Sequence, residues 1–333
     1  MRIVETERVA ERIKKGCVLT IGNFDGVHIG HQAILAAARE AAGKRRVELV
    51  AMTFQPHPLA VLNPEKAPQT LTPARLKGQL LSQSGVDLHI VIKSSQELLR
   101  LSAEEFLDRF ITKGVQPAVV VEGDDFNFGA ERAGSIHMLK QLGSEKGFEV
   151  IIVGAKLITL ADNQTVRVSS SLIRYMLRHG HVADAAMALG RAYRLIEKII
   201  PGRGKGKRLG FGTLNLARGG QLIPAEGVYA GFVGIGDSFE QLCNSKAKMP
   251  AAFSIGISAT YGGDNPLLIE AHLLGKDPGE SAGKYMAMDF VERIREQKKF
   301  ETEKELTSQI AKDCEKAEEI LTTVRKDSQG ENT

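Results

Sequence analysis

Apolar residues gather in short continuous runs along the first half of the chain. The runs cover residues 17–21, 47–54, 88–92, 118–121 and 149–153. Stretches of helical character separate them and begin near His31, Arg75, Ala103 and Gly134. Runs without polar alternation predict strands buried on both faces, and helices between them predict a parallel sheet. Ligands of such a sheet bind beyond the carboxyl ends of its strands.

The pattern changes after a short helix expected over residues 182–189, which Gly190 ends. Strand-like runs then follow at residues 194–200, 227–233, 251–257 and 267–274, separated by Gly, Pro and Asn turns. This spacing favours an all-β sandwich or a small β-barrel.

The last long segment reads as an amphipathic helix that packs on this β domain. Thr302 and Glu305 form a capping-box pattern at its start. Its apolar stripe consists of Leu306, Ile310, Cys314, Ala317 and Leu321. The predicted domains are therefore 1–185, an α/β domain, and 191–325, a β domain with a C-terminal helix, followed by a polar tail over 326–333.

Composition narrows the class of protein. A chain of 333 residues is long for one core, and 43% hydrophobic with 25% charged residues is typical of a globular protein. A net charge of +4 suits a binder of anionic small molecules but is too small and dispersed for nucleic acid. The three cysteines predict neither a disulfide framework nor a zinc site, and no run is apolar enough to cross a membrane. We expect a cytoplasmic enzyme without nucleic-acid or membrane partners. Whether the chain forms a homo-oligomer is left open.

The segment from Gly22 to His31, Gly-Asn-Phe-Asp-Gly-Val-His-Ile-Gly-His, carries the first candidate chemistry. It reads as strand, glycine turn and helix start, where free backbone N–H groups and the helix dipole favour a phosphate. Turn-forming Asn23 and Asp25 support the loop, and Gly30 has no side chain to keep a ligand from the backbone.

His28 and His31 lie three residues apart, on one face of the first helical turn. Both imidazoles could bind phosphate oxygens. Surface or helix-capping histidines are the plainer interpretation. A zinc site lacks a third ligand, because no cysteine or further histidine lies nearby in the sequence.

Three later segments also carry candidate functional residues, because each one follows a predicted strand or stands at the start of a predicted helix. They are Thr-Phe-Gln-Pro-His-Pro at 53–58, Gly-Asp-Asp-Phe-Asn-Phe-Gly at 123–129 and Arg-Val-Ser-Ser-Ser-Leu-Ile-Arg at 167–174. Taken singly, His57 suits a turn, Phe126 and Phe128 suit a core, and the serines suit a helix cap. Serine hydroxyls followed by an arginine one turn later also suit a second phosphate cradle. The glycine- and lysine-rich stretch 202–215 reads either as a solvated basic turn or as a phosphate-binding loop.

Together these strings resemble the bifunctional prokaryotic riboflavin kinase/FAD synthetase family, whose first half carries the His-x-Gly-His signature of nucleotidyltransferases. The resemblance implies a Rossmann-like α/β domain that transfers the adenylyl group of ATP to FMN, with His28 and His31 at the α-phosphate. The residues that it places around ATP are Gly22, Asn23, Asp25, Gly30, Arg167, Ser170, Ser171 and Arg174. On the flavin side it places His57, Asp125, Phe126 and Phe128.

The second half resembles the riboflavin kinase barrel of the same family. The resemblance implies that Thr213 and Asn215 bind Mg²⁺ and ATP and that Glu270 is the general base for the ribityl hydroxyl of riboflavin. Gly206, Lys207 and Gly210 would hold ATP phosphates, and Arg295 would lie near the flavin.

The kinase half also departs from the family pattern. Gly212 stands where proline is usual, Leu214 replaces a small alanine, and Lys205 replaces an arginine. One alternative is therefore an FAD synthetase whose barrel only binds flavin or docks. A non-enzymatic flavin-responsive regulator is another, although binding alone does not require two phosphate cradles. Other nucleotidyltransferases share the histidine loop, but they lack the kinase-like second half.

Overall fold

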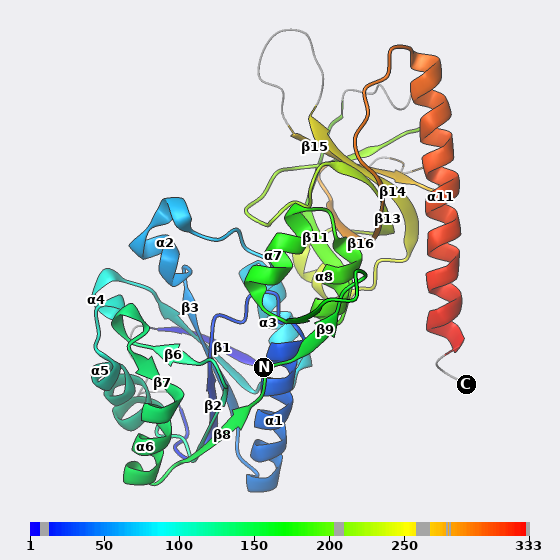
Figure 1. Ribbon diagram of the computed structural model, residues 1–333. Helices are drawn as coiled ribbons and strands as arrows, with labels where there is room; N and C mark the ends of the chain where they lie inside the picture. Colours follow the sequence, from blue (N-terminus) through cyan, green and yellow to red (C-terminus); the bar gives the residue numbers. More distant parts are fainter. Residues whose placement is uncertain (7–12, 203–209, 258–266, 278, 280, 331–333) are drawn as a thin grey trace. The chain divides into compact units, whose positions relative to one another are not determined.

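The computed structural model describes the chain except for residues 7–12, 203–209, 258–266, 278, 280 and 331–333 (Figure 1). The described residues form two compact units, Met1–Ser170 and Ser171–Thr333. Each unit has its own sheet, and the two are described separately below.

A six-stranded parallel sheet organises the first unit, as the sequence predicts. Its order is β1-β4-β3-β2-β5-β8, and every neighbouring pair is parallel. The strands are β1 Arg2–Thr6, β2 Val18–Ile21, β3 Leu49–Gln55, β4 Leu88–Lys93, β5 Val119–Gly123 and β8 Glu149–Val153. From β2 the chain moves through β3 to β4, and β5 then returns to the other side of β2. The order therefore switches between β2 and β5, and a crevice for ligands is expected there.

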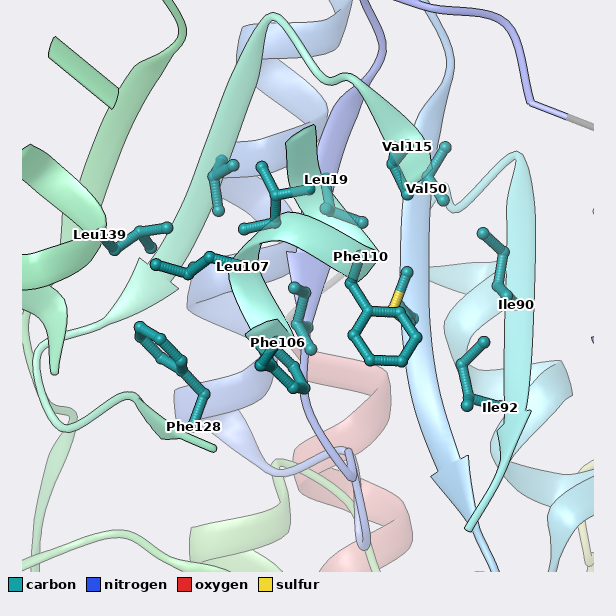
Figure 2. Packing of buried hydrophobic residues seen from close by; sticks show 14 of the residues in the cluster. Leu19, Val50, Ile90, Ile92, Phe106, Leu107, Phe110, Val115, Phe128 and Leu139 are labelled. Atoms are coloured by element: carbon teal, nitrogen blue, oxygen red, sulfur yellow. The ribbon is translucent and has the colours of Figure 1, made fainter. Parts of the chain in front are cut away.

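Helices cover both faces of this sheet, which explains the unbroken apolar runs of its strands (Figure 1). The helices of the unit are α1 Ile29–Arg45, α2 Pro58–Leu62, α3 Ala74–Gln83, α4 Gln96–Leu99, α5 Ala103–Leu107 and α6 Ile136–Lys146, with the π-helix η2 Asp108–Val115 and the short 3-10 helices η1 Pro64–Lys66 and η3 Ala130–Arg132. Of these, α2 buries none of its residues. Leu35 of α1 packs into the cluster on one face. On the other face Phe106, Phe110 and Leu139 pack over Leu19 of β2 (Figure 2).

Short strands and one edge strand complete the unit. The short ones are β6 Asn127–Phe128, β7 Gly134–Ser135, β9 Leu157–Thr159 and β10 Thr165–Arg167. Among the described strands, the edge strand β1 pairs only with β4. The sequence analysis missed β1 because its residues, Arg-Ile-Val-Glu-Thr, are largely exposed and carry two charges, as is usual at a sheet edge.

The second unit contains a closed antiparallel barrel, which settles the choice between sandwich and barrel. The strand order is β11-β12-β15-β14-β13-β16. The strands are β11 Tyr193–Ile200, β12 Leu214–Leu216, β13 Gly227–Gly236, β14 Met249–Ile257, β15 Leu267–Leu273 and β16 Tyr285–Arg295, accompanied by α7 Ser170–Arg178, α8 Val182–Leu189 and α10 Phe239–Asn244.

The sequence analysis missed β16 because it carries Asp289. Arg194, directly opposite on β11, binds that carboxylate through Nε and Nη2 at 2.6 Å each.

The C-terminal helix, α11 Glu303–Gly330, lies along the barrel as predicted (Figure 1). Ala317 and Leu321 are buried against Ala230 and Ala252. Half of the predicted capping box is present, because the Thr302 hydroxyl accepts from the Glu305 N–H at 3.2 Å. The Glu305 carboxylate accepts instead from the N–H of Glu301. The helix also continues past Lys326, where the sequence analysis placed a tail.

Candidate active sites

The histidine loop joins the buried strand β2 to helix α1. The helix begins at Ile29, and His28 is its N-cap. The Nδ1 atom of His28 accepts from the backbone N–H of His31 at 3.3 Å. An accepting Nδ1 carries no proton, so the neutral His28 ring holds its proton on Nε2. His28 thus caps the helix and still presents an N–H donor.

The two imidazoles stack on each other. Their ring centroids lie 3.6 Å apart, and the planes differ by 18°. A Cβ atom added to Gly30 would lie 3.1 Å from Nδ1 of His28. A side chain at position 30 would therefore require the His28 ring to shift by a few tenths of an ångström. The ligand access that the sequence analysis expected at Gly30 stays a prediction.

Three left-handed residues bend the loop between β2 and α1. They are Phe24, Gly26 and Val27, with φ of 46°, 86° and 41°. A β-branched residue such as Val27 is rarely found there, so the surrounding contacts must enforce the conformation. Asp25 supplies such contacts, since its buried carboxylate accepts from the backbone N–H groups of Leu71 and Thr72 at 2.9–3.1 Å. This anchors the loop; a contact of Asp25 with ATP stays a prediction.

Two residues from different predicted segments meet beside this loop. The Nδ2 atom of Asn23 lies 3.3 Å from Nε2 of His57. His57 follows β3 and also caps α2, because its Nδ1 accepts from the N–H of Leu59 at 3.2 Å. The loops after β2 and β3 therefore contact each other at the carboxyl edge of the sheet.

The loop after β5 meets β10 through an arginine. Arg167 forms an ion pair with Asp124 and another, at 3.1 Å, with Asp125. These side chains are well exposed. The fold thus brings together Arg167 and Asp125, which the sequence analysis assigned to pyrophosphate and to the flavin.

The two phenylalanines of the β5 loop differ in exposure. Phe128 is buried and stacks on Phe106 with ring centroids 5.5 Å apart. Phe126 is half-buried and packs on Phe128 at 5.4 Å. Phe128 therefore has the core position that is usual for such a residue, and Phe126 is the ring that still reaches the surface.

Ser170 connects the second phosphate-binding signature to the histidine loop. Its hydroxyl donates to the backbone carbonyl of Asp25 at 2.8 Å. The following residues of the signature belong to the second unit, where Ser171 is exposed and Arg174 is buried. Their contact with ATP stays a prediction.

The predicted kinase residues come together on the barrel. Asn215 of β12 lies directly opposite Glu270 of β15. The Thr213 hydroxyl donates to Oε1 of Glu270 at 3.1 Å. A hydroxyl, an amide and a carboxylate therefore converge, and hard oxygen atoms of this kind suit Mg²⁺.

Two described glycines of the stretch 202–215 have structural reasons of their own. A Cβ atom on Gly202 would lie 2.3 Å from Nδ2 of Asn215, so only glycine leaves room for the amide. Gly210 has a φ of 86°, which also favours glycine. The predicted phosphate ligands Gly206 and Lys207 lie outside the described residues.

Arg295 has a structural contact that the sequence did not suggest. Its Nε and Nη2 atoms donate to the buried carboxylate of Asp313 on α11 at 2.9 and 2.6 Å. The pair therefore fastens the C-terminal helix to β16. A role of Arg295 at the flavin stays a prediction.

Comparison with known proteins identifies the family. A family model described as FAD synthetase matches residues 10–172, and one described as riboflavin kinase matches residues 189–321. The bifunctional riboflavin kinase/FMN adenylyltransferase of Escherichia coli (strain K12) is 33% identical over 300 residues, which cover 90% of this chain and 91% of that protein. The chain belongs to this bifunctional family.

Other relatives extend the match. The protein of the same description from Pseudomonas fluorescens is 34% identical over 300 residues, again 90% of this chain and 91% of the relative. A crystal structure titled macrolide-efflux protein from Streptococcus pneumoniae superposes with a TM-score of 0.80 at 25% identity, over 95% of this chain and 98% of that one. Among the described residues, no helix is both long and apolar enough to cross a membrane.

Two of the departures from the kinase pattern of the family, Gly212 and Leu214, can be described, whereas Lys205 lies outside the described residues. The carbonyl of Gly212, which replaces proline, accepts from Nδ1 of His272 at 2.9 Å. Leu214 is buried and lies opposite Ala271, a core residue, whereas Asn215 and Glu270 face the other way. The bulk of Leu214 therefore points into the barrel and away from the predicted nucleotide.

The sequence analysis did not select His272 or Glu122 as candidate site residues. Glu122 is 2% exposed, and its Oε1 atom accepts from the backbone N–H of Ile21 at 2.6 Å. Burial raises the pKa of its carboxyl well above the ordinary value. The available signal was a glutamate at the end of an apolar strand, directly before the Gly123 loop.

Proposed function

We propose that the chain carries out two consecutive reactions, each in its own catalytic domain. The chain is a riboflavin kinase and FMN adenylyltransferase: riboflavin and ATP give FMN, and FMN and ATP then give FAD and pyrophosphate. The proposed catalytic domains are 1–185 for adenylyl transfer and 191–325 for phosphorylation. Free Cys17, Cys243 and Cys314 support a cytoplasmic location.

The stacked histidine pair carries the assignment of the adenylyl-transfer site. The Nε2–H of His28 and the N-terminal amides of α1 can donate to an anionic oxygen, and the helix dipole adds to the attraction. The FMN phosphate oxygen attacks the α-phosphorus of ATP, and the bond to the bridging oxygen of pyrophosphate breaks. Catalysis then consists of alignment and of stabilising the charge that develops on the α-phosphate, with His31 beside His28.

The remaining residues of the adenylyl-transfer site bind the rest of the substrates. Gly22, Asn23, Asp25 and Gly30 shape the ATP pocket, and Ser170, Ser171 and Arg174 hold the leaving pyrophosphate. Arg167 has five N–H donors, so it can keep its carboxylate partner and bind a phosphate as well.

For the flavin we propose the loops after β3 and β5. Phe126 offers a ring surface for stacking, supported from below by Phe128. His57 and Asp125 would supply polar contacts at the same edge of the sheet.

In the kinase site we propose Glu270 as the general base. Its carboxylate would take the proton of the ribityl hydroxyl as that oxygen attacks the γ-phosphorus of ATP, and ADP leaves. Thr213 and Asn215 would hold Mg²⁺, which when bound neutralises charge on the ATP phosphates. Gly206, Lys207 and Gly210 would hold those phosphates, and Arg295 would lie at the flavin.

One experiment tests both assignments. Riboflavin, ATP and Mg²⁺ are supplied to the wild type and to the His31→Ala and Asn215→Ala variants, and FMN and FAD are separated by chromatography. The wild type should form both products, His31→Ala should accumulate FMN, and Asn215→Ala should form FAD only from added FMN. FAD formation by His31→Ala at the wild-type rate would refute the histidine assignment. A wild type that makes FAD only from added FMN would favour an FAD synthetase with an inactive barrel.

A further inference from the structure

The proposed reactions give no role to Glu122, the most deeply buried carboxyl group beside the histidine loop. It lies near the end of β5, two residues after Val120 and therefore on the same face of the strand. Val120 belongs to the buried apolar cluster that contains Leu19 and Phe110. The Oε1 atom of Glu122 accepts from the Ile21 N–H at 2.6 Å. Burying an ionisable group in such surroundings is unfavourable, so its presence needs a reason.

The reason lies in how β2 pairs with its two neighbours. On one side β2 pairs with β3 as far as Ile21 and Met52. On the other side its pairing with β5 reaches only Leu19 and Val120, although β5 itself continues to Gly123. The two strands therefore part at the point where the strand order of the sheet switches.

Because β2 and β5 separate there, the N–H of Ile21 has no backbone carbonyl of β5 as its acceptor. A buried N–H without any acceptor costs about 1–3 kcal/mol. The Glu122 side chain reaches across and supplies that acceptor. The backbones can then separate while the amide of Ile21 stays bonded.

Both ends of this bridge are the starting points of functional loops. Ile21 directly precedes the histidine loop at Gly22, and Glu122 directly precedes the loop that carries Asp125. The negative charge of Asp125 also acts on Glu122 and adds to the rise of its pKa. One side chain thus links the loop proposed for the α-phosphate to the loop proposed for the flavin.

We propose that Glu122 is a positioning residue for adenylyl transfer, which holds the carboxyl ends of β2 and β5 at the separation that both substrates require. The proposal rests on the proposed function of the first unit. It assigns the role to a hydrogen-bond acceptor and not to a negative charge, so glutamine should replace glutamate and leucine should not.

The test compares Glu122→Gln and Glu122→Leu with Val120→Ala, a matched control that opens a cavity on the same strand face. FAD formation from FMN and ATP gives kcat and KM, and riboflavin phosphorylation by the same preparation measures the intact second unit. We expect Glu122→Leu to lose about tenfold to a hundredfold in kcat, the size of effect that a displaced reacting group produces. Its KM for ATP should change less. Glu122→Gln and Val120→Ala should stay within about threefold of the wild type, and all variants should phosphorylate riboflavin normally.

Three results would overturn the proposal: wild-type kcat in Glu122→Leu, an equal loss in Glu122→Gln, or an equal loss in Val120→Ala. If Glu122→Leu fails to fold, Glu122→Asp decides, because it keeps the carboxyl but draws it back by one methylene. A lower kcat together with faster hydrogen exchange at the Ile21 amide supports the proposal, and unchanged values for both contradict it. A wild type that forms no FAD would instead count against the proposed function.

Discussion

His89 should make the first unit sensitive to acid. It is the second residue of β4, is 4% exposed, and its Nε2 atom is 2.9 Å from the Thr53 hydroxyl. Burial, together with the charge of Lys77, lowers its pKa from 6.5 to about 4. The folded state therefore prefers the neutral ring. In the unfolded chain the ring takes up a proton as the pH falls below 6.5.

The stabilising effect is complete above pH 6.5 and is lost as the pH falls toward 4. The full shift corresponds to about 3 kcal/mol, of which about 2 kcal/mol is lost by pH 5. Hydrogen exchange of the slowest β4 amides, corrected for the intrinsic pH dependence of exchange, reports unfolding of the first unit alone. His89→Gln cannot titrate, so the wild type should lose about 2 kcal/mol more than this variant between pH 7 and pH 5. Equal losses would refute the reasoning.

Three further substitutions test other contacts. Gly30→Ala should push the His28 ring aside, since the added Cβ would lie 3.1 Å from Nδ1; FAD formation should slow about tenfold, and unchanged FAD formation would contradict this. Asp313→Ala leaves the guanidinium of Arg295 buried without its carboxylate and should cost about 3 kcal/mol of stability in urea unfolding followed by circular dichroism. An unchanged midpoint would show that α11 is held by its apolar stripe alone. Gly212→Ala meets no atom within 4 Å and should stabilise the second unit by about 0.5 kcal/mol in the same assay, because the unfolded chain loses freedom; a lower midpoint would reveal a hidden clash.

The sequence predicted the elements that are buried on both faces or have a clear turn at each end. It missed β1, which is short and charged, and β12, which is only three residues long. It also missed β16, because a carboxylate inside a strand is unexpected until the arginine opposite it is known. That pairing depends on tertiary structure.

The candidate sites were predictable wherever the local sequence alone determines the geometry. The helix start at His28 is an example. Thr213 and Glu270, which are 57 positions apart, were named together only because of the family resemblance. Contacts between distant segments were not predictable, and these include the bond from Asn23 to His57. Glu122 escaped notice for the same reason, since its partner is a backbone amide on a strand far away in the sequence.

The cross-strand pairing of Asn215 with Glu270 has a consequence for how the barrel can change over evolutionary time. Side chains alternate along a strand, so a slip of β12 by one residue against β15 would turn Asn215 inward, away from Glu270, and bring Leu214 out into water. Misaligned barrels of this kind are unstable as well as inactive. Selection for a folded protein alone therefore also keeps the phosphorylation machinery in alignment.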